Sequence, residues 1–284
     1  MDNTQDILEL ARQEIAARRA AEATRHPEQP WLWAFIALGT TLLLGLLFLP
    51  IRGLDYRLQM VVQGVCAQAH YLGLGGLRLP LCARNTGIYA GFVATALSLV
   101  ALRRTRAAGL PPIAITLALV LGAIAMIVDG VNSMLLDIGN YHFYTPRNEL
   151  RVASGLLMGS AIAVFMLLIL NMALRKAPRV EQPVVRSWTE YAALLLADIA
   201  VYVLVFFGPD FLYYPLAILS VAGIIAVLFA SNLFVLAMVG GLEGRISRLR
   251  QLSRPATLAL IATGLELGLL AGLRAWLEHS TMVM

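Results

Sequence analysis

Long apolar runs separated by short polar segments dominate the hydropathy pattern of this chain. Seven of the runs approach or exceed the roughly 20 residues that an α-helix needs to cross a bilayer. We predict spans at residues 31–50, 86–102, 112–131, 151–174, 188–207, 212–239 and 256–276. Prolines lie next to several of these boundaries, where they favour helix starts and stops. The pattern predicts an all-α, polytopic membrane bundle of about seven helices.

Two segments outside the spans also have a helical pattern. Residues 54–74 are moderately apolar but contain Arg57, three glutamines and His70, which are too many polar groups for a lipid-facing helix. We predict an interfacial or re-entrant helix there. Residues 1–27 are polar with apolar side chains at helical spacing, which predicts a cytoplasmic amphipathic helix, with a solvated helix as the alternative. Residues 28–284 then form a single transmembrane domain.

The composition supports a membrane protein and argues against a nucleic-acid partner. The chain has 284 residues, of which 59% are hydrophobic and 14% charged, whereas soluble domains carry about a quarter charged residues. The net charge of +5 comes from basic clusters in short loops, which membrane topology requires. We therefore expect the lipid bilayer to be the main partner and expect no nucleic acid.

The distribution of basic residues also predicts an orientation. With a cytoplasmic N-terminus, most of the 22 basic residues, including clusters at 103–106 and 175–186, fall on the cytoplasmic side. Cytoplasmic loops of membrane proteins carry such an excess. We expect a prokaryotic plasma (inner) membrane, with the N-terminus cytoplasmic and the C-terminus extracytoplasmic.

Candidate chemistry gathers between the first two spans, on the expected extracytoplasmic side. Cys66 and His70 are four residues apart and share a face if this segment is helical, and Cys82 follows a run of glycines. Three hypotheses remain open. The cysteines form a structural disulfide or are two inert thiols; they bind a metal ion or cofactor together with His70; or they are a redox-active pair. Of these possibilities, the pattern favours the absence of any cofactor over a metal ion bound at Cys66, His70 and Cys82.

Polar residues at the ends of later spans face the same side. Asp129 and Asn132 end the third span, and Glu149 and Arg151 begin the fourth. Charged groups at the edge of a bundle need partners, so we expect Arg151 to pair with Asp129 and Arg84 to pair with Glu149. Such groups serve either as helix ends and structural pairs or as a working pocket.

If they form a pocket, its chemistry suits an anion. Guanidinium groups bind phosphate and carboxylate, including those of lipid headgroups. The candidate ligand-binding residues are Arg84, Asn85, Tyr89, Asn148 and Arg151. The candidate general acids and bases are His70, Asp129 and Glu149.

Two acids and several glycines lie inside the predicted spans. Asp198 and Glu266 are near the centres of the fifth and seventh spans, where a carboxylate serves proton relay or bonds to a neighbouring helix. Small residues four apart allow helices to approach closely. They occur at Gly87 and Gly91, at Gly155 and Gly159, and at Gly264, Gly268 and Gly272. We expect these faces to pack the bundle or to contact another membrane subunit.

Residues 81–91, with the sequence LCARNTGIYAG, resemble the CARCTGIYxG signature of an uncharacterised family of prokaryotic multi-pass membrane proteins. The upstream Cys66, the pair Asp129-Gly130 and the run Asn148 to Arg151 are similar to its other motifs, and the resemblance covers roughly residues 60–165. Two positions depart from the family. Asn85 replaces the second cysteine of the signature, and His70 stands four residues after Cys66 rather than directly after it. The resemblance implies a membrane bundle and carries no reaction.

These features together predict a multi-pass membrane protein with a polar Cys/His/Arg/Asp pocket at its extracytoplasmic face, which binds or processes a small anionic or lipid ligand. An accessory subunit of a larger membrane complex is one alternative. A proton-coupled transporter that uses Asp198 and Glu266 is the other. The residues assign no reaction, so enzymatic activity stays open.

Overall fold

The computed structural model describes residues 12–15, 28–66, 70–139 and 141–282. The amphipathic helix expected at 1–27 therefore lies almost wholly outside the described residues. The rest forms a helical bundle, as the hydropathy pattern predicts. Its helices are α2 (Gln29–Phe48), α3 (Leu54–Val62), α4 (Ala83–Ala101), α5 (Ile113–Asp137), α6 (Asn148–Leu174), α7 (Trp188–Phe207), α8 (Tyr213–Val239) and α9 (Ser253–Met282). Short 3₁₀ helices, Asp210–Leu212 and Leu249–Leu252, precede α8 and α9.

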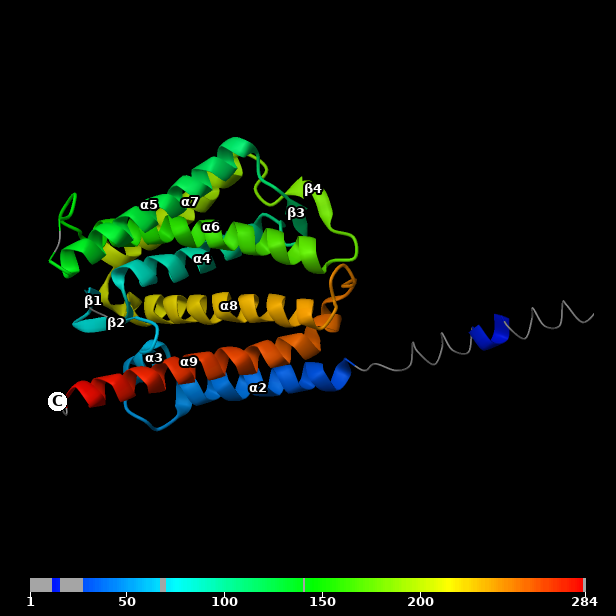
Figure 1. Cartoon of the computed structure of the whole chain (residues 1–284), viewed down its shortest axis with the longest axis horizontal. Coiled ribbons are helices and arrows are strands. Elements are labelled where there is room, and N and C mark those ends of the chain that lie inside the picture. The colour runs from blue at the N-terminus through cyan, green and yellow to red at the C-terminus, as the bar shows by residue number, and fades with distance from the viewer. Residues whose placement is uncertain (1–11, 16–27, 67–69, 140, 283–284) are drawn as a thin grey trace, which may run out of the picture.

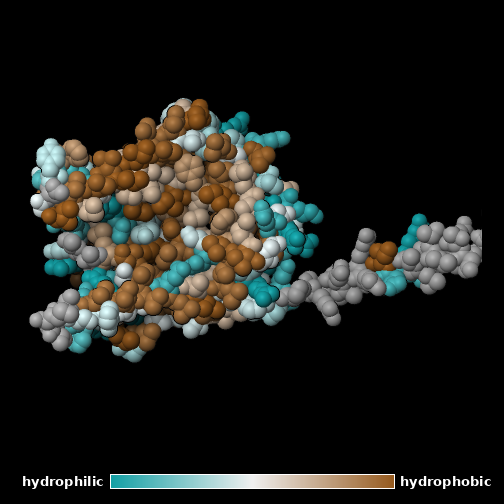
Figure 2. All heavy atoms as spheres, viewed as in Figure 1, coloured by the Kyte–Doolittle hydropathy of each residue, from teal (hydrophilic) through white to brown (hydrophobic). Residues whose placement is uncertain are grey.

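The long helices run side by side between two ends of the bundle (Figure 1). One end carries a β-hairpin, β1 (Tyr71–Leu74) and β2 (Leu77–Cys82), and we call it the hairpin end. The other carries the strand pair β3 (Ala107–Gly109) and β4 (Arg179–Pro183), and we call it the β3–β4 end. Hydrophobic side chains cover the middle of the face in Figure 2, and hydrophilic ones gather at the β3–β4 end. This distribution is the one that a bilayer imposes on a spanning bundle.

Among the described residues, six of the long helices are apolar enough to cross a membrane, and α4 is the one long helix that is not. Arg84, Asn85 and Thr86 in its first turn lower its hydropathy. In compensation, every residue of Ala83–Gly91 is buried or half-buried, whereas Leu97 and Val100 in its second half are exposed. Neighbouring helices, rather than lipid, thus cover the polar half. Multiple spans are confirmed, and the count of seven stays a prediction.

Glycines bring α4 and α6 into backbone contact. A Cβ placed on Gly91 of α4 lies 2.7 Å from the carbonyl oxygen of Leu156, and a Cβ on Gly155 of α6 lies 2.5 Å from that of Arg84. Gly87 and Gly159 make equivalent approaches. Two interlocked small-residue faces therefore form the α4–α6 interface, as the four-residue spacing predicts.

The glycines of α9 behave differently. Among the described residues, nothing lies within 4 Å of a Cβ placed on Gly264, Gly268 or Gly272. This ridge therefore does not pack closely against the described bundle, and its contact with another membrane subunit stays a prediction. Two of the three, Gly264 and Gly268, instead line an apolar cavity of about 300 Å³ beside α2 and α3.

The segment after α2 also departs from its prediction. Its helix, α3, ends at Val62, because Gly64 abuts the backbone of Leu270 and the chain then turns into β1. Cys66 and His70 are therefore not on one helix face. Gly75 and Gly76, with φ of 60° and 73°, form the two-residue turn of an antiparallel hairpin, which requires left-handed backbone at both positions.

Main-chain hydrogen bonds tie together three loops at the β3–β4 end. β3 follows α4, β4 follows α6, and the two strands pair in parallel. The loop between α8 and α9 joins them, because Ile246 N–H donates to Leu174 O at 2.9 Å and Lys176 N–H donates to Ile246 O at 3.0 Å. The side chain of Asn171 in α6 also joins these segments, because it donates hydrogen bonds to the carbonyl oxygens of Thr105 and Ala107.

Candidate functional site

An ion pair between α4 and α5 forms the centre of a polar cluster at the hairpin end. Arg84 Nη2 donates to Asp129 Oδ2 at 2.7 Å and to Ser133 Oγ at 2.9 Å. The Asp129 side chain is only 4% exposed and that of Arg84 is 22% exposed. The predicted ion pairs, Arg151 with Asp129 and Arg84 with Glu149, are therefore wrong, because Asp129 pairs with Arg84. Glu149 is exposed in the first turn of α6, so Asp129 takes its place beside Arg84.

The loop before α6 closes over this ion pair. Tyr144 Oη donates to Asp129 Oδ1 at 2.7 Å. Asn132 accepts from Phe143 N–H at 2.7 Å and donates to Tyr144 O at 2.8 Å. Burial, and then the hydrogen bond to Asp129, raise the pKa of Tyr144 to about 12. Because this value lies above the usual tyrosine pKa of about 10, the contact stabilises the fold fully below pH ~10 and is lost as the pH rises through 12.

A second arginine, Arg151 of α6, lies near Arg84. Arg151 is 5% exposed and within electrostatic range of both Arg84 and Asp129. Its Nη1 donates to Asn148 Oδ1 at 3.1 Å, and Asn148 Nδ2 in turn donates to Tyr71 O of the hairpin at 3.3 Å. Within the part of the chain that the structure describes, the buried Nε atoms of both arginines have no hydrogen-bond partner. We refer to Arg84, Asp129, Tyr144, Asn148 and Arg151 as the arginine cluster.

The two cysteines meet beside this cluster. A hydrogen bond joins the thiols of Cys66 and Cys82, which are both half-buried and not linked to each other. This hydrogen bond and then burial raise the pKa of the Cys82 thiol. A thiol with a raised pKa is a poor nucleophile at neutral pH, whereas thiols in contact can be joined by oxidation.

His70 does not complete a ligand set with the cysteines. Its Nε2 lies 3.5 Å from Asp137 Oδ2, at the end of α5. Across residues 12–15, 28–66, 70–139 and 141–282, no three histidine, cysteine or acidic side chains are placed to hold a metal ion. The predicted trio of Cys66, His70 and Cys82 is thus assembled only in part.

Two other predicted ligand-binding residues, Asn85 and Tyr89, lie in α4 close to the cysteines. The backbone N–H of Asn85 donates to Cys82, and Tyr89 lies within electrostatic range of both cysteines. Sequence reasoning missed Tyr144 and Ser133. Ser133 is four residues after Asp129 and therefore shares its helix face, a spacing that would have identified it. Tyr144 lies in a loop, where no periodic pattern marks a contact.

The two intramembrane acids belong to separate networks. Asp198 of α7 accepts from Ser160 of α6 at 2.6 Å, and Ser160 lies 2.5 Å from Thr95 of α4. Since Ser160 donates its one proton to Asp198, Thr95 donates to Ser160. Glu266 of α9 accepts from Asn232 of α8 at 2.9 Å. Each acid therefore bonds to a neighbouring helix.

Comparison with known proteins supports the membrane assignment. Residues 66–165 match the model of a family described as "Predicted membrane protein (DUF2085)". The match covers about a third of the chain and contains the cysteines, the hairpin and the arginine cluster. It confirms the resemblance to an uncharacterised membrane protein family. No curated protein and no solved structure matches the chain.

Proposed function

We propose that this membrane protein binds a small anionic group, a phosphate or a carboxylate, at the arginine cluster. The observation that carries the proposal is Arg151, a buried guanidinium whose Nε has no hydrogen-bond partner among the described residues and which lies beside a second arginine. The one carboxylate within the cluster, Asp129, already accepts hydrogen bonds from Arg84 and Tyr144. The cluster therefore has a net positive charge and unused donors.

The cost of leaving these donors unused supports a ligand. Asp129 and Asp137 lie within electrostatic range of Arg151, but its buried Nε donates a hydrogen bond to neither of them, and a buried donor that is left without an acceptor costs about 1–3 kcal/mol, or more on a charged group. A phosphate or carboxylate would accept from both arginines in charge-assisted hydrogen bonds, which are roughly twice as strong as neutral ones. Such a group can belong to a soluble anion or to a lipid headgroup at the membrane surface.

Replacing Arg151 by glutamine is expected to weaken anion binding tenfold or more. The affinity is measured from the rise in melting temperature of the detergent-solubilised protein with inorganic phosphate, and separately with dihexanoyl phosphatidic acid. A response to both probes identifies a site for the free anion, and a response to the lipid alone identifies a headgroup site. Arg151→Lys keeps the charge and is expected to retain part of the affinity.

The control variant is Arg147→Gln. Arg147 lies at the same end of the bundle, immediately before α6, but is exposed. We expect it to leave the affinity unchanged. Equal binding by wild type and Arg151→Gln, or an equal loss in Arg147→Gln, would contradict the proposal.

We do not extend the proposal to transport. A proton path that used both intramembrane acids would need them in one network, but Asp198 bonds to α6 and Glu266 bonds to α8. An anion site that is confined to one end of the bundle matches the contacts better.

We also infer that the hairpin end is extracytoplasmic. The basic clusters around Arg103 and Arg175 lie at the β3–β4 end, and cytoplasmic loops carry such an excess. Alkaline phosphatase fused to the C-terminus is expected to be active, and the same enzyme inserted after Ala177 is expected to be inactive. The reverse pattern would place the arginine cluster in the cytoplasm.

A further inference from the structure

A cationic cavity lies at the β3–β4 end, at the opposite end of the bundle from the arginine cluster. Its volume is about 480 Å³. The side chains that line it are Arg106, Arg175, Lys176, Ala177, Arg179, Ile246 and Ser247. No acidic residue is among these lining residues, within the part of the chain that the structure describes.

The walls of the cationic cavity are held in place by backbone pairing. Its residues come from the three loops that main-chain hydrogen bonds join at this end, including the bond between Lys176 and Ile246. Arg175 is further fixed, because its Nε donates to Asn171 Oδ1 at 2.7 Å. The backbone positions that carry the like charges are therefore held close together by the fold.

This arrangement is electrostatically unfavourable without an anion. Burial, and then the charges of Arg106 and Arg179, lower the pKa of Arg175. Like charges at close range disfavour one another, and a bound anion would reverse that effect. Clusters of basic side chains in pockets at the membrane surface are suited to acidic lipid headgroups.

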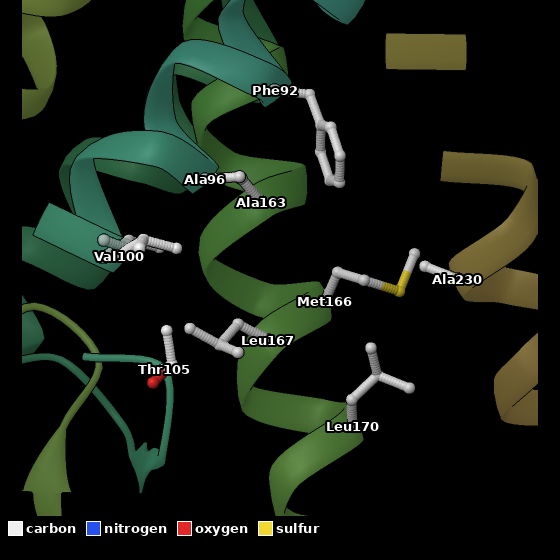
Figure 3. Close-up of a pocket in the computed structure, with 10 residues that line it drawn as sticks. Phe92, Ala96, Val100, Thr105, Ala163, Met166, Leu167, Leu170 and Ala230 are labelled. Carbon is white, nitrogen blue, oxygen red and sulfur yellow. The ribbon is translucent and has the colours of Figure 1, made fainter. Parts of the chain in front are cut away.

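A second cavity, which is apolar, lies closer to the middle of the bundle than the cationic cavity. It has a volume of about 180 Å³ and lies between α4, α6 and α8. In Figure 3, Met166 extends from α6 toward Ala230 of α8, and Thr105 and Leu170 lie at one end of the cavity. Almost all of its surface is hydrocarbon.

Residues that are close together in the chain line the two cavities. Thr105 lines the apolar cavity and Arg106 lines the cationic one. On α6, Leu170 lines the first and Arg175 the second, and five residues of helix span about 7.5 Å. A polar compartment directly beyond an apolar one, at the end of a spanning bundle, has the polarity pattern of a phospholipid.

We propose that the β3–β4 end binds one anionic phospholipid from the adjacent leaflet, with its phosphate headgroup in the cationic cavity and an acyl chain in the apolar cavity. This site is independent of the arginine cluster. Charge complementarity selects an acidic headgroup over a zwitterionic one, and the apolar cavity selects a lipid over a free anion.

The test is native mass spectrometry of the intact protein, released from detergent after incubation with phosphatidylglycerol or with phosphatidylcholine of the same acyl chains. We expect one retained phosphatidylglycerol at lipid concentrations where phosphatidylcholine is not retained. The variant Arg106→Gln/Arg175→Gln is expected to reduce retention tenfold or more. Arg106→Gln alone, at an exposed position outside the helices, is expected to give a smaller loss with an unchanged melting temperature.

Two further variants separate the contributions. Arg245→Gln/Arg250→Gln removes the same charge from exposed positions at the same end that do not line the cavity, and we expect full retention. Ala230→Phe fills the apolar cavity while the cationic side chains remain, and we expect lipid to be lost.

Three outcomes would overturn the proposal. These are equal retention of the two lipids, an equal loss in the control pair, and displacement of phosphatidylglycerol by millimolar inorganic phosphate. The first means that headgroup charge does not select the lipid, the second means a general surface charge, and the third means a site for free anions. Phosphate binding at the arginine cluster is measured separately, with Arg151→Gln, so the two proposals can fail independently.

Discussion

Replacing Gly91 by leucine is expected to prevent stable assembly of the bundle. Even the first carbon of a side chain at this position lies 2.7 Å from the carbonyl oxygen of Leu156 and 2.9 Å from its Cα. Backbone atoms cannot rotate away as a side chain can, so α4 and α6 must separate. Overpacking of this kind costs about 1–3 kcal/mol for a small addition and more for a large one. We expect Gly91→Ala to lower the melting temperature by several degrees and Gly91→Leu to give aggregated protein.

The matched control is Gly268 in α9. It is also a glycine inside a long helix, but a Cβ there meets nothing within 4 Å. Alanine has the better helix propensity, by up to about 1 kcal/mol, so Gly268→Ala should leave the melting temperature unchanged or slightly raised. Thermal unfolding in mild detergent, followed by circular dichroism, makes the comparison. Equal effects at both glycines would show that helix propensity, rather than contact between α4 and α6, decides stability.

The second large effect is expected from Asp129→Ala. This change leaves Arg84 without its counter-charge and Tyr144 without its acceptor. Removing one partner of a buried ion pair costs about 3–5 kcal/mol. For a chain of this size, the same unfolding measurement should show a fall in melting temperature of about 10 °C.

A double-mutant cycle tests the cause. If the loss arises from the unpaired Arg84, then Asp129→Ala/Arg84→Ala should be less destabilised than the sum of the single variants, by about 1–3 kcal/mol. Asp137→Ala serves as the control, because it removes a carboxylate from the same helix whose side chain is 51% exposed. We expect a change within about 1 kcal/mol there. Additive losses in the cycle would remove the ion pair from the explanation.

The helices were predictable because a helix that crosses the hydrocarbon core needs about 20 consecutive, predominantly apolar residues. The predicted span at 188–207 coincides with α7, and those at 212–239 and 31–50 differ from α8 and α2 by one or two residues. The errors lie where helices extend beyond the apolar core. α5 continues to Asp137 and α6 begins at Asn148, because a helix in the interface can carry polar side chains that hydropathy counts against it.

The small β-elements required other signals. The hairpin is marked by Gly75-Gly76, a dipeptide typical of a two-residue turn, whereas the prediction placed residues 71–74, which form β1, at the end of a helix. The pairing of β3 with β4 has no local mark. It joins Ala107 to Arg179, two loop residues whose contact depends on how α4 and α6 pack.

The candidate site was predictable in its composition but not in its pairing. Topology alone brought Arg84, Asp129 and Arg151 to one end of the bundle. The choice of partner depends on helix rotation, which the interlocked glycines of α4 and α6 set. That rotation leaves Glu149 exposed and places Arg84 against Asp129. The rotation of each helix about its axis cannot be read from a hydropathy pattern.

The burial of the polar half of α4 has a consequence for biogenesis. During synthesis α4 leaves the ribosome before α5, α6 and α8, which supply the partners of its first half. Until α5 arrives, Arg84 lacks its counter-ion Asp129, and an unpaired arginine makes insertion of a segment into the bilayer less favourable. The segment should therefore wait at the insertion machinery or the membrane surface and enter the bilayer together with α6. Completion of the bundle is then a post-insertion step, and a chain that stops before α6 would expose α4 to the quality-control proteases of the membrane.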